Sequence, residues 1–533
     1  MTAVPTDIPP ASTGPTATGP THATTTDPTA PGRRPNFVII VPDQLRADAL
    51  GCFGNPVART PHIDALAARG TAFDEAYVQN PVCSPSRASF LTGWYPHVRG
   101  HRTLTHLLQA DEPNLLRILK DAGYHVSWAG VRGDTFAPGV TERSVTEYGF
   151  ATPPTRTQSA DYPSEAWARL FYRGRVTAPG TDHDEAAVST AELRLSSPPP
   201  EPWVVFVPLI APHCPFEVAE PWFSMHDRDA MPDPFPPSDR EPRFKTSLRR
   251  LHGLDRVTPD MWREVIATYY GMVSRLDDHV GRMMAALEAG GQADRTVTLF
   301  FADHGEYLGD FGLIEKWPSG MDRCLTRDPL IVSGGGLPGG QRTGSLVELL
   351  DIVPTVLELA GVEAPHRHFG RSLLPLLDDP AMPHREYVFT EGGFTSPEEP
   401  QLGHPAFPYD LKGVLEHEDV ESTGRVAAVR DGRWTYVWRL YEPAELYDRS
   451  TDPDERVNLA GTPEVADVER RMEQVLFRWH VETSDVIPLQ ADPRFPQVDL
   501  PAPGSVPGAE AESGTEGSRG GPGDDHEGSA PRP

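Results

Sequence analysis

Three short apolar runs constrain the fold of this chain more than any other feature. They lie at residues 36–41, 203–209 and 296–302, and none of them contains a charged side chain. Continuous runs rich in β-branched and aromatic residues are typical of strands covered on both faces, as in parallel sheets. The sequence therefore predicts an α/β fold with a large, mostly parallel central sheet flanked by helices.

Helix and turn signals between and after these runs indicate how the rest of the chain is organised. Large apolar residues recur at helical spacing over residues 259–289, which predicts a long helix. Residues 130–200 and 216–258 are rich in proline and polar residues, so irregular segments are expected there, the second one over the mouth of a site. Further on, short apolar runs around an Asp431-Gly432 turn indicate an antiparallel sheet.

These patterns and the local composition predict four regions. Residues 1–35 consist mostly of Thr, Pro, Ala and Gly and are expected to be a disordered tail. Residues 36–380 are predicted to form the main α/β domain, and residues 381–498 a smaller C-terminal α+β subdomain with the antiparallel sheet. Residues 499–533, rich in Gly, Pro, Ser and acidic residues, are expected to be a disordered acidic tail.

Polar residues directly follow two of the three apolar runs. Asp43-Gln44 comes after the first run, and Asp303-His304 comes after the third. In open α/β sheets, ligands bind beyond the carboxyl ends of the strands, which is where these side chains would lie. An isolated aspartate in such a place is more often a turn or cap residue, so each pair alone leaves both interpretations open.

A further distinctive segment spans residues 81–93. Its first half is rich in helix-breaking residues and its second half favours a helix, so Cys83 is expected at a helix N-terminus. Free N–H groups and the helix dipole favour an anion there, and Arg87 would add a positive charge one turn later. A buried cysteine at a helix cap is the structural alternative.

The order Cys83-x-Pro-x-Arg87, followed by Leu-Thr-Gly93, resembles the signature of the type I sulfatases. The resemblance extends over roughly residues 36–490, with the motifs in the family's order, and implies an alkaline phosphatase-like fold. It also implies that a formylglycine-generating enzyme oxidises Cys83 to Cα-formylglycine. A hydrated aldehyde attacks through one hydroxyl group, and collapse of the other then expels sulfate, whereas a sulfated thiol would turn over slowly.

The resemblance implies a site for one divalent metal ion. The implied ligands are Asp43, Gln44, Cys83, Asp303 and His304. Carboxylate ligands favour a hard cation, and calcium is the leading assignment. An imidazole among the ligands leaves manganese or zinc as alternatives.

The family also implies residues that contact the sulfate group and the leaving oxygen. His213, within residues 212–216, is expected to act as a general acid or as a hydrogen-bond donor, and Lys316 is expected to reach the sulfate. His101 and Arg102 stand near the place where many members carry Lys-x-His, so they are candidates for substrate binding, with a solvated loop as the alternative. The segment after Lys316 departs from the family pattern, so the resemblance does not predict which residues line the leaving-group side of the pocket.

Together these features predict a sulfatase that hydrolyses a small anionic sulfate ester to an alcohol and inorganic sulfate. The Asp-Gln and Asp-His pairs resemble the choline-sulfatase and phosphonate monoester hydrolase branch of the superfamily. A phosphonate monoester or phosphodiester hydrolase is therefore one alternative, since both substrates present a singly charged tetrahedral centre. A catalytically silent binding protein is the other alternative, in case Cys83 stays unmodified.

Composition limits the partners of the chain. The formal net charge of -28 over 533 residues argues against nucleic acid and anionic membrane surfaces. No apolar run approaches the length needed to span a bilayer, and the first 35 residues lack the apolar core of a signal peptide, so a cytoplasmic location is expected. The four cysteines do not suggest a disulfide framework. The sequence leaves open whether the chain forms a homo-oligomer.

Overall fold

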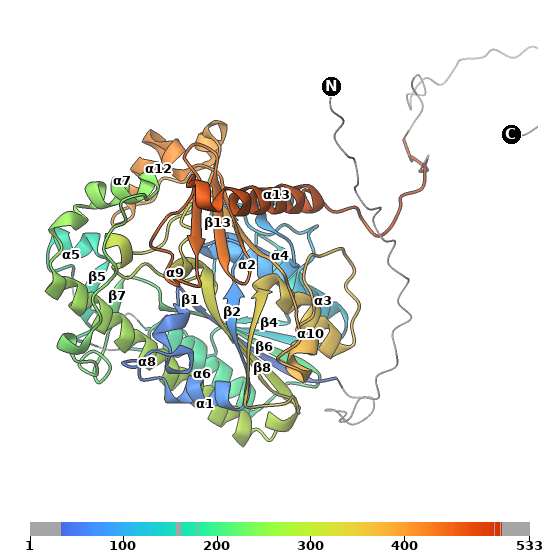
Figure 1. Cartoon of the computed structure of the whole chain (residues 1–533). Coiled ribbons are helices and arrows are strands. Elements are labelled where there is room, and N and C mark those ends of the chain that lie inside the picture. Colours follow the sequence, from blue (N-terminus) through green and yellow to red (C-terminus); the bar gives the residue numbers. More distant parts are fainter. Residues whose placement is uncertain (1–33, 156–160, 179, 495, 501–502, 504–533) are drawn as a thin grey trace, which may run out of the picture. The chain divides into compact units, whose positions relative to one another are not determined.

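The computed structural model of the chain describes residues 34–155, 161–178, 180–494, 496–500 and 503 (Figure 1). The predicted N-terminal tail lies almost entirely outside the described residues, and so does most of the predicted C-terminal tail. The described residues up to Ile487 form one compact unit, which contains every element discussed below, and the described residues from Pro488 onward form another.

An eight-stranded sheet forms the centre of the first unit. In spatial order its strands are β10 (Gln341–Glu348), β2 (Gly70–Tyr77), β9 (Arg327–Gly334), β8 (Thr296–Phe301), β1 (Asn36–Asp43), β6 (Trp203–Pro212), β3 (His125–Ala129) and β4 (Glu147–Gly149). Strand β9 runs antiparallel to both of its neighbours, and the other neighbouring pairs are parallel. The predicted fold class is therefore confirmed, and the three apolar runs form the adjacent strands β8, β1 and β6.

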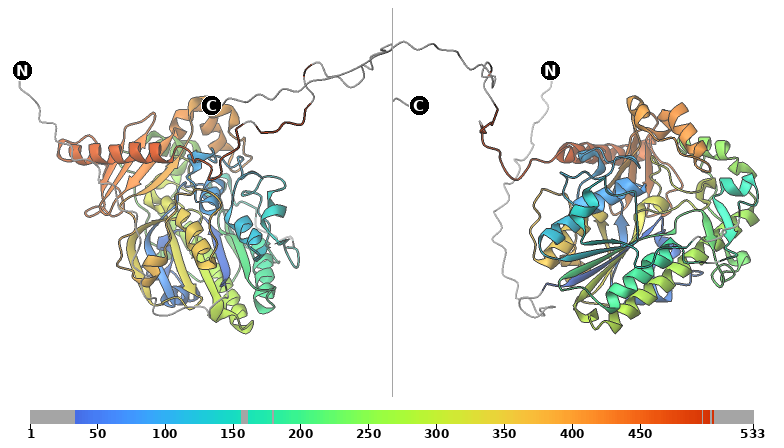
Figure 2. Two further views of the ribbon diagram at one scale, coloured as in Figure 1. Left: turned by 90° about the vertical axis from the view of Figure 1, so that its right-hand side faces the viewer. Right: turned by 180° about the vertical axis from the view of Figure 1, so that it is seen from behind.

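Helices cover both faces of this sheet (Figures 1 and 2). On β1, Phe37, Ile39 and Val41 pack into one core, while Val38 and Ile40 pack into the other. The first core includes α2 (Cys83–Thr92), α3 (Leu115–Asp121) and α10 (Ile352–Ala360), and the second includes α1 (Pro61–Ala68), α6 (His183–Ser196) and α8 (Pro259–Ala289). Since two strands and two helix layers surround β1, the position of its carboxyl end is tightly fixed.

A four-stranded antiparallel sheet follows in the chain. Its strands are β11 (Val388–Gly392), β12 (Val426–Arg430), β13 (Trp434–Arg439) and β14 (Glu445–Asp448), in that spatial order. Strands β12 and β13 pair as the hairpin expected at Asp431-Gly432. Helix α13 (Ala466–Thr483) packs on this sheet through Met472 and Leu476, in a cluster that also includes Tyr95, which follows α2 in the chain. The predicted domain boundary at residue 380 stays a prediction.

Two segments that were expected to be irregular contain helices. Helix α6 lies within residues 130–200, and α7 (Arg243–His252) lies within residues 216–258. The side chain of Asp182 caps α6 by accepting the backbone N–H of Glu185, a start signal that the sequence does carry. Helix α7 buries Lys245, which a search for apolar periodicity counts as exposed. The expectation of irregular structure is wrong for these stretches.

Smaller elements lie beside the sheet and border the site. They are α5 (Glu165–Arg169), the paired strands β5 (Tyr172–Arg175) and β7 (Phe216–Val218), and α12 (Asp410–Glu418), which packs against α7. Further short helices are α4 (Val140–Ser144), α9 (Arg323–Thr326) and α11 (Leu374–Asp378). Among the helices of the described residues, none combines the length and the apolar character that crossing a bilayer requires.

Candidate active site

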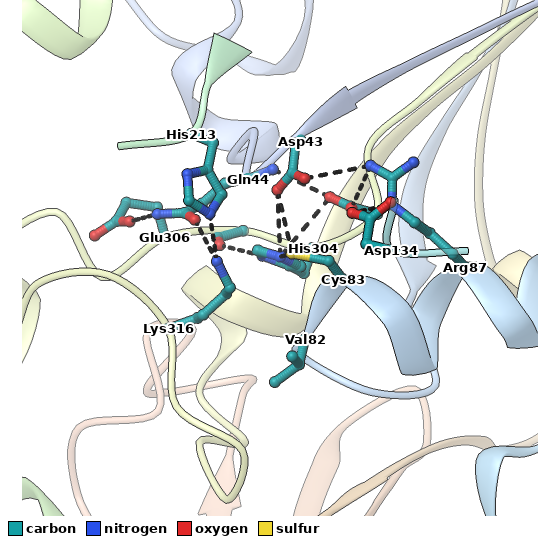
Figure 3. Close-up of polar contacts among 12 residues, drawn as sticks. Asp43, Gln44, Val82, Cys83, Arg87, Asp134, His213, His304, Glu306 and Lys316 are labelled. Carbon is teal, nitrogen blue, oxygen red and sulfur yellow. Dashed lines mark hydrogen bonds and ion pairs between the residues drawn. The ribbon is translucent and has the colours of Figure 1, made fainter. Parts of the chain in front are cut away.

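Two neighbouring strand ends and one helix start converge on a buried cluster of polar side chains (Figure 3). Asp43 is the last residue of β1, Asp303 follows the adjacent strand β8, and Cys83 is the first residue of α2. One potential ligand atom from each of these residues and from His304 lies within 4.8 Å of the others, and all four residues are buried. The structure thus brings together four of the five predicted metal ligands.

Cys83 faces this cluster from the N-terminus of its helix. The Cys83 Sγ atom lies 3.1 Å from His304 Nε2 and 3.5 Å from Asp43 Oδ1. Burial, and after it the negative charge of Asp43, raise the pKa of the Cys83 thiol well above its usual value. These protein groups keep the thiol protonated at neutral pH, although only the thiolate is a good nucleophile.

His304 presents a lone pair to the cluster. Its Nδ1 atom lies 2.9 Å from the carbonyl oxygen of Gly305, and since a carbonyl only accepts, Nδ1 carries the proton. The unprotonated Nε2 atom lies 3.6 Å from Asp43 Oδ1 and 3.8 Å from Asp303 Oδ1. Burial lowers the pKa of His304, which favours this neutral form. Two carboxylates and a neutral imidazole are a donor set that suits a divalent cation.

Two arginines contact the same carboxylates. Arg87 Nη2 donates to Asp303 Oδ2 at 2.7 Å and to Asp43 Oδ2 at 3.3 Å. Arg132 Nη2 donates to Asp43 Oδ2 at 2.5 Å and also pairs with Asp134. Burial opposes ionisation of Asp43, but the charge of Arg132 and the other nearby cationic groups outweigh it and hold the pKa of Asp43 well below its usual value.

Arg132 and Asp134 were not among the site residues predicted from the sequence. They follow β3, which is parallel to β6 in the same sheet, so its carboxyl end lies at the edge that also carries Asp43. The rule that pointed to the residues after β1 and β8 applies equally to this strand. The signal was therefore present, but it lay at the start of the stretch that was expected to be irregular.

Lys316 and His213 form a second part of the site. Lys316 Nζ donates to Gln44 Oε1 and to Glu315 Oε1, each at 2.7 Å. It lies 2.8 Å from His213 Nε2, while His213 Nδ1 lies 2.5 Å from the carbonyl oxygen of Cys214 and so carries the ring proton. Burial, and then the charge of Lys316, lower the pKa of His213 to about 4. At pH 7 the ring is therefore neutral and accepts the hydrogen bond from Lys316.

Gln44 joins the two parts of the site. Its backbone N–H donates to Asp303 Oδ1 at 3.1 Å. Its side-chain nitrogen donates to Glu306, and its side-chain oxygen accepts from Lys316. The Gln44 side chain thus contacts Glu306 and Lys316, beside the four clustered ligands, and its predicted role as a metal ligand stays a prediction.

Glu306 is another buried residue that the sequence analysis did not single out. Its Oε1 atom accepts the backbone N–H groups of Leu308 at 2.8 Å and Glu315 at 2.5 Å. Burial, and then the charge of Glu315, raise the pKa of Glu306 to about 7. Through these two hydrogen bonds the carboxyl group holds together the two ends of the segment 308–315, which directly precedes Lys316. Its place two residues after His304 was the signal that could have drawn attention to it.

His101 and Arg102 have other partners. His101 Nε2 lies 2.9 Å from Glu112 Oε2, and Arg102 forms an ion pair with Glu398. In the part of the chain that the structure describes, neither side chain has a hydrogen bond or ion pair to the clustered ligands or to Lys316. The structure does not bring these two residues into the site, and their contact with substrate stays a prediction.

Comparison with known proteins points to one family. A family model described as Sulfatase matches residues 35–362. A multifunctional alkaline phosphatase superfamily protein of Trinickia caryophylli is 26% identical over 521 residues, covering 85% of this chain and 96% of that protein. The choline-sulfatase of Rhizobium meliloti (strain 1021) is 27% identical over 462 residues, covering 81% of this chain and 83% of that protein. The solved structure of a phosphonate monoester hydrolase from Silicibacter pomeroyi shares the fold, with a TM-score of 0.68 and 24% identity over 84% of this chain and 96% of that one.

Proposed function

Because the chain belongs to the sulfatase family, we propose that it hydrolyses a small anionic sulfate ester to an alcohol and inorganic sulfate, with Cys83 as the source of the nucleophile. Membership of this family identifies the protein as a sulfuric ester hydrolase. The identities of the nucleophile, the metal ion and the substrate are what we propose here. One observation carries the proposal: Cys83 Sγ lies among two carboxylates and an unprotonated imidazole nitrogen at a helix N-terminus. A cysteine that only fills core space needs no such neighbours.

We assign a divalent metal ion to Asp43, Asp303 and His304, with residue 83 and Gln44 as further ligands. The charged and lone-pair donors in this cluster fit that assignment. Calcium is our first choice because carboxylate oxygens dominate the set, and manganese or zinc is the alternative because of the imidazole. When bound, such an ion stabilises negative charge on the ester oxygens and lowers the pKa of a neighbouring hydroxyl group.

Modification of Cys83 to Cα-formylglycine would remove the difficulty that the raised pKa of the thiol presents. The hydrated aldehyde supplies one hydroxyl group for attack and a second whose collapse releases sulfate. Arg87, which is bonded to both carboxylates, adds a fixed positive charge one turn into the same helix. A formylglycine-generating enzyme is therefore part of the proposal as the partner in maturation.

Lys316 is the group that we assign to the departing oxygen. Burial opposes its charge, but the surrounding negative groups, Glu315 among them, raise the pKa of Lys316 well above its usual value, so the ammonium group stays charged at neutral pH. His213, with a pKa of about 4, is neutral at that pH and accepts a hydrogen bond from Lys316. We therefore give the donor role to Lys316, and His213 orients its ammonium group.

A phosphonate monoester or phosphodiester hydrolase is the second candidate function. Two observations favour it: the Asp-Gln and Asp-His pairs at the strand ends, and the shared fold with the phosphonate monoester hydrolase. A phosphate diester and a sulfate monoester carry the same single negative charge on a tetrahedral centre, so the charges of the site do not separate them.

Mass spectrometry of the peptide that carries Cys83 tests the proposal, on protein produced with and without a formylglycine-generating enzyme. We expect conversion to the aldehyde, together with hydrolysis of 4-nitrophenyl sulfate that Cys83→Ala abolishes. Preference for a phenyl phosphonate monoester over the sulfate in the converted protein would favour the second candidate. Unmodified cysteine in both preparations would contradict the proposed nucleophile and favour a silent binding protein.

A further inference from the structure

The residue before Lys316 is a buried carboxylate that two ammonium groups share. Glu315 is 3% exposed, and its Oε1 atom accepts from Lys316 Nζ at 2.7 Å. Its Oε2 atom accepts the backbone N–H of Lys316 at 2.9 Å and also pairs with the ammonium group of Lys412. Glu315 has a φ of 67°, a left-handed conformation that is uncommon for a residue with a side chain. Such strained positions persist only where surrounding contacts fix them.

Lys412 reaches this position from a distant part of the sequence. It lies on α12, 97 residues after Glu315, in the segment that joins β11 to β12 of the small sheet (Figure 1). Its ammonium group contacts both the carboxylate of Glu315 and the carbonyl oxygen of Lys316. It also lies 5.9 Å from the ring centre of Phe171 and 5.8 Å from that of Trp317. Lys412 therefore holds this segment through both the side chain of Glu315 and the backbone of Lys316.

The charges explain why a second lysine is needed. Glu315 and Lys316 alone would form a buried neutral pair, and Glu315 would then hold the ammonium group of Lys316 as its only cationic partner. With Lys412 the three residues carry one net positive charge, which favours binding of an anionic ester. The remaining hydrogens of the Lys316 ammonium group then point to Gln44 and His213, next to the clustered ligands.

We propose that Lys412 is a positioning residue of the active site: by sharing the carboxylate of Glu315 and binding the carbonyl of Lys316, it orients the Lys316 ammonium group toward the substrate. The inference rests on the proposed function in so far as Lys316 contacts the departing oxygen. It makes the C-terminal part of the chain a contributor to catalysis, through a residue that does not itself touch the substrate.

Kinetics of Lys412→Met on a series of aryl sulfates test this proposal. Methionine keeps the length and the apolar stem of lysine and removes the charge. We expect kcat to fall about tenfold to a hundredfold, with the loss growing as the leaving phenol becomes more basic, because Lys316 is then less well placed on the departing oxygen. Lys412→Arg, which keeps the charge, should retain activity to within about threefold.

Two comparisons separate positioning from simple destabilisation. In a Lys316→Met background, Lys412→Met should lower kcat by less than about twofold, since its effect acts through Lys316. Lys245→Met is the matched control, because Lys245 is also buried, pairs with Asp322 at 2.5 Å and lies 3.9 Å from the ring centre of Phe311. It should lower the melting temperature without changing the dependence on the leaving group. Equal losses of kcat in both backgrounds would overturn the proposal.

A crystal structure of Lys412→Met gives a result that does not depend on activity. We expect the Lys316 ammonium group to leave His213 and move toward Glu315. An unchanged Lys316 would overturn the inference even if the enzyme is an active sulfatase. Conversely, a displaced Lys316 in a protein that hydrolyses no sulfate ester would support the positioning role and contradict the proposed function. If Lys412→Met does not fold, Lys412→Gln serves in the same three measurements.

Discussion

Asp43 and Asp303 lie at the carboxyl ends of adjacent buried strands, whereas Lys316 lies on a loop held by a helix from the C-terminal part of the chain. The first part of the site inherits its geometry from backbone hydrogen bonds along the sheet. The second part depends on buried charges: Glu315 lies between two lysines, and its own backbone is in the left-handed region.

The difference shows that one active site can combine two kinds of support. Hydrogen bonds of a sheet persist over a wide range of pH and salt, so the strand-end part should be a rigid platform for the proposed nucleophile and the proposed metal ion. Buried ion pairs persist only while each partner is present and correctly protonated. We therefore expect the two parts to respond differently to mutation, metal removal and acid.

The largest effect is expected from Asp303→Asn, which removes one charge from the strand-end part and leaves the sheet intact. Asp303 accepts from Arg87 at 2.7 Å and from the backbone of Gln44 at 3.1 Å, so its loss leaves a buried arginine underpaired and weakens the proposed metal site. We expect kcat/KM to fall by about a thousandfold or more. We also expect added calcium, the proposed ion, to raise the melting temperature of the wild type and not that of the variant.

Asp328→Asn is the matched control for that variant. Asp328, on β9, is fully buried, and burial followed by the charge of Asp303 raises its pKa well above the usual value, which favours the uncharged carboxyl group. Asparagine has the shape of that uncharged form, so activity should stay within a few-fold of the wild type. Equal losses in the two variants would show that the site does not depend on the charge of Asp303, which would break the comparison.

Sequence reasoning succeeded where chemistry and local structure coincide. Asp43, Cys83 and Asp303 each lie at the end of a recognisable strand or at the start of a recognisable helix, and the resemblance to the sulfatases then implied that they meet. The fold class followed from the same strands, because continuous apolar runs indicate burial on both faces.

Other parts of the site depend on contacts that no local pattern encodes, or on signals that their surroundings obscured. Lys412 lies 97 residues from Glu315, and its helix has no sequence feature that identifies the loop on which it packs. Arg132 followed a recognisable strand, but the proline-rich stretch after it concealed its role. For His101 and Arg102 the family motif matched only loosely, and the structure pairs them with Glu112 and Glu398.

Acid should destabilise the part of the site around Lys316, where two histidines resist protonation, before the strand-end part, where one, His304, does so. This order would sharpen the comparison. His252, buried on α7, has its pKa lowered to about 4 by burial and then by Lys412, and His213 has a pKa of about 4 as well. Between pH 6.5 and 4 these two histidines are protonated in the unfolded chain but remain neutral in the folded chain. The free energy of unfolding therefore falls as pH falls, by on the order of 1–3 kcal/mol for each group. Below about pH 4 these two groups add no further loss.

Hydrogen exchange across this pH range locates the effect. Amides of α7 and α12 should lose protection before those of β1 and β8, and His252→Phe should flatten the dependence of urea unfolding on pH between 6.5 and 4. Simultaneous loss of protection in both parts would mean that the sheet shares the acid sensitivity of the loop and that the two kinds of support are not separable.

The smallest effect is expected at Arg102, which tests where the site ends. Its ion pair with Glu398 and its hydrogen bond to the carbonyl of Gly393 at 3.1 Å leave it no contact with the site among the described residues, so Arg102→Ala should change kcat/KM by less than about twofold. Loss of a partly exposed ion pair costs about 1 kcal/mol or less, which predicts a small decrease in melting temperature. A tenfold rise in KM at an unchanged melting temperature would instead place Arg102 on the substrate. The loop before α3 would then supply a third kind of support, and the division between strand ends and buried charges would no longer describe the whole site.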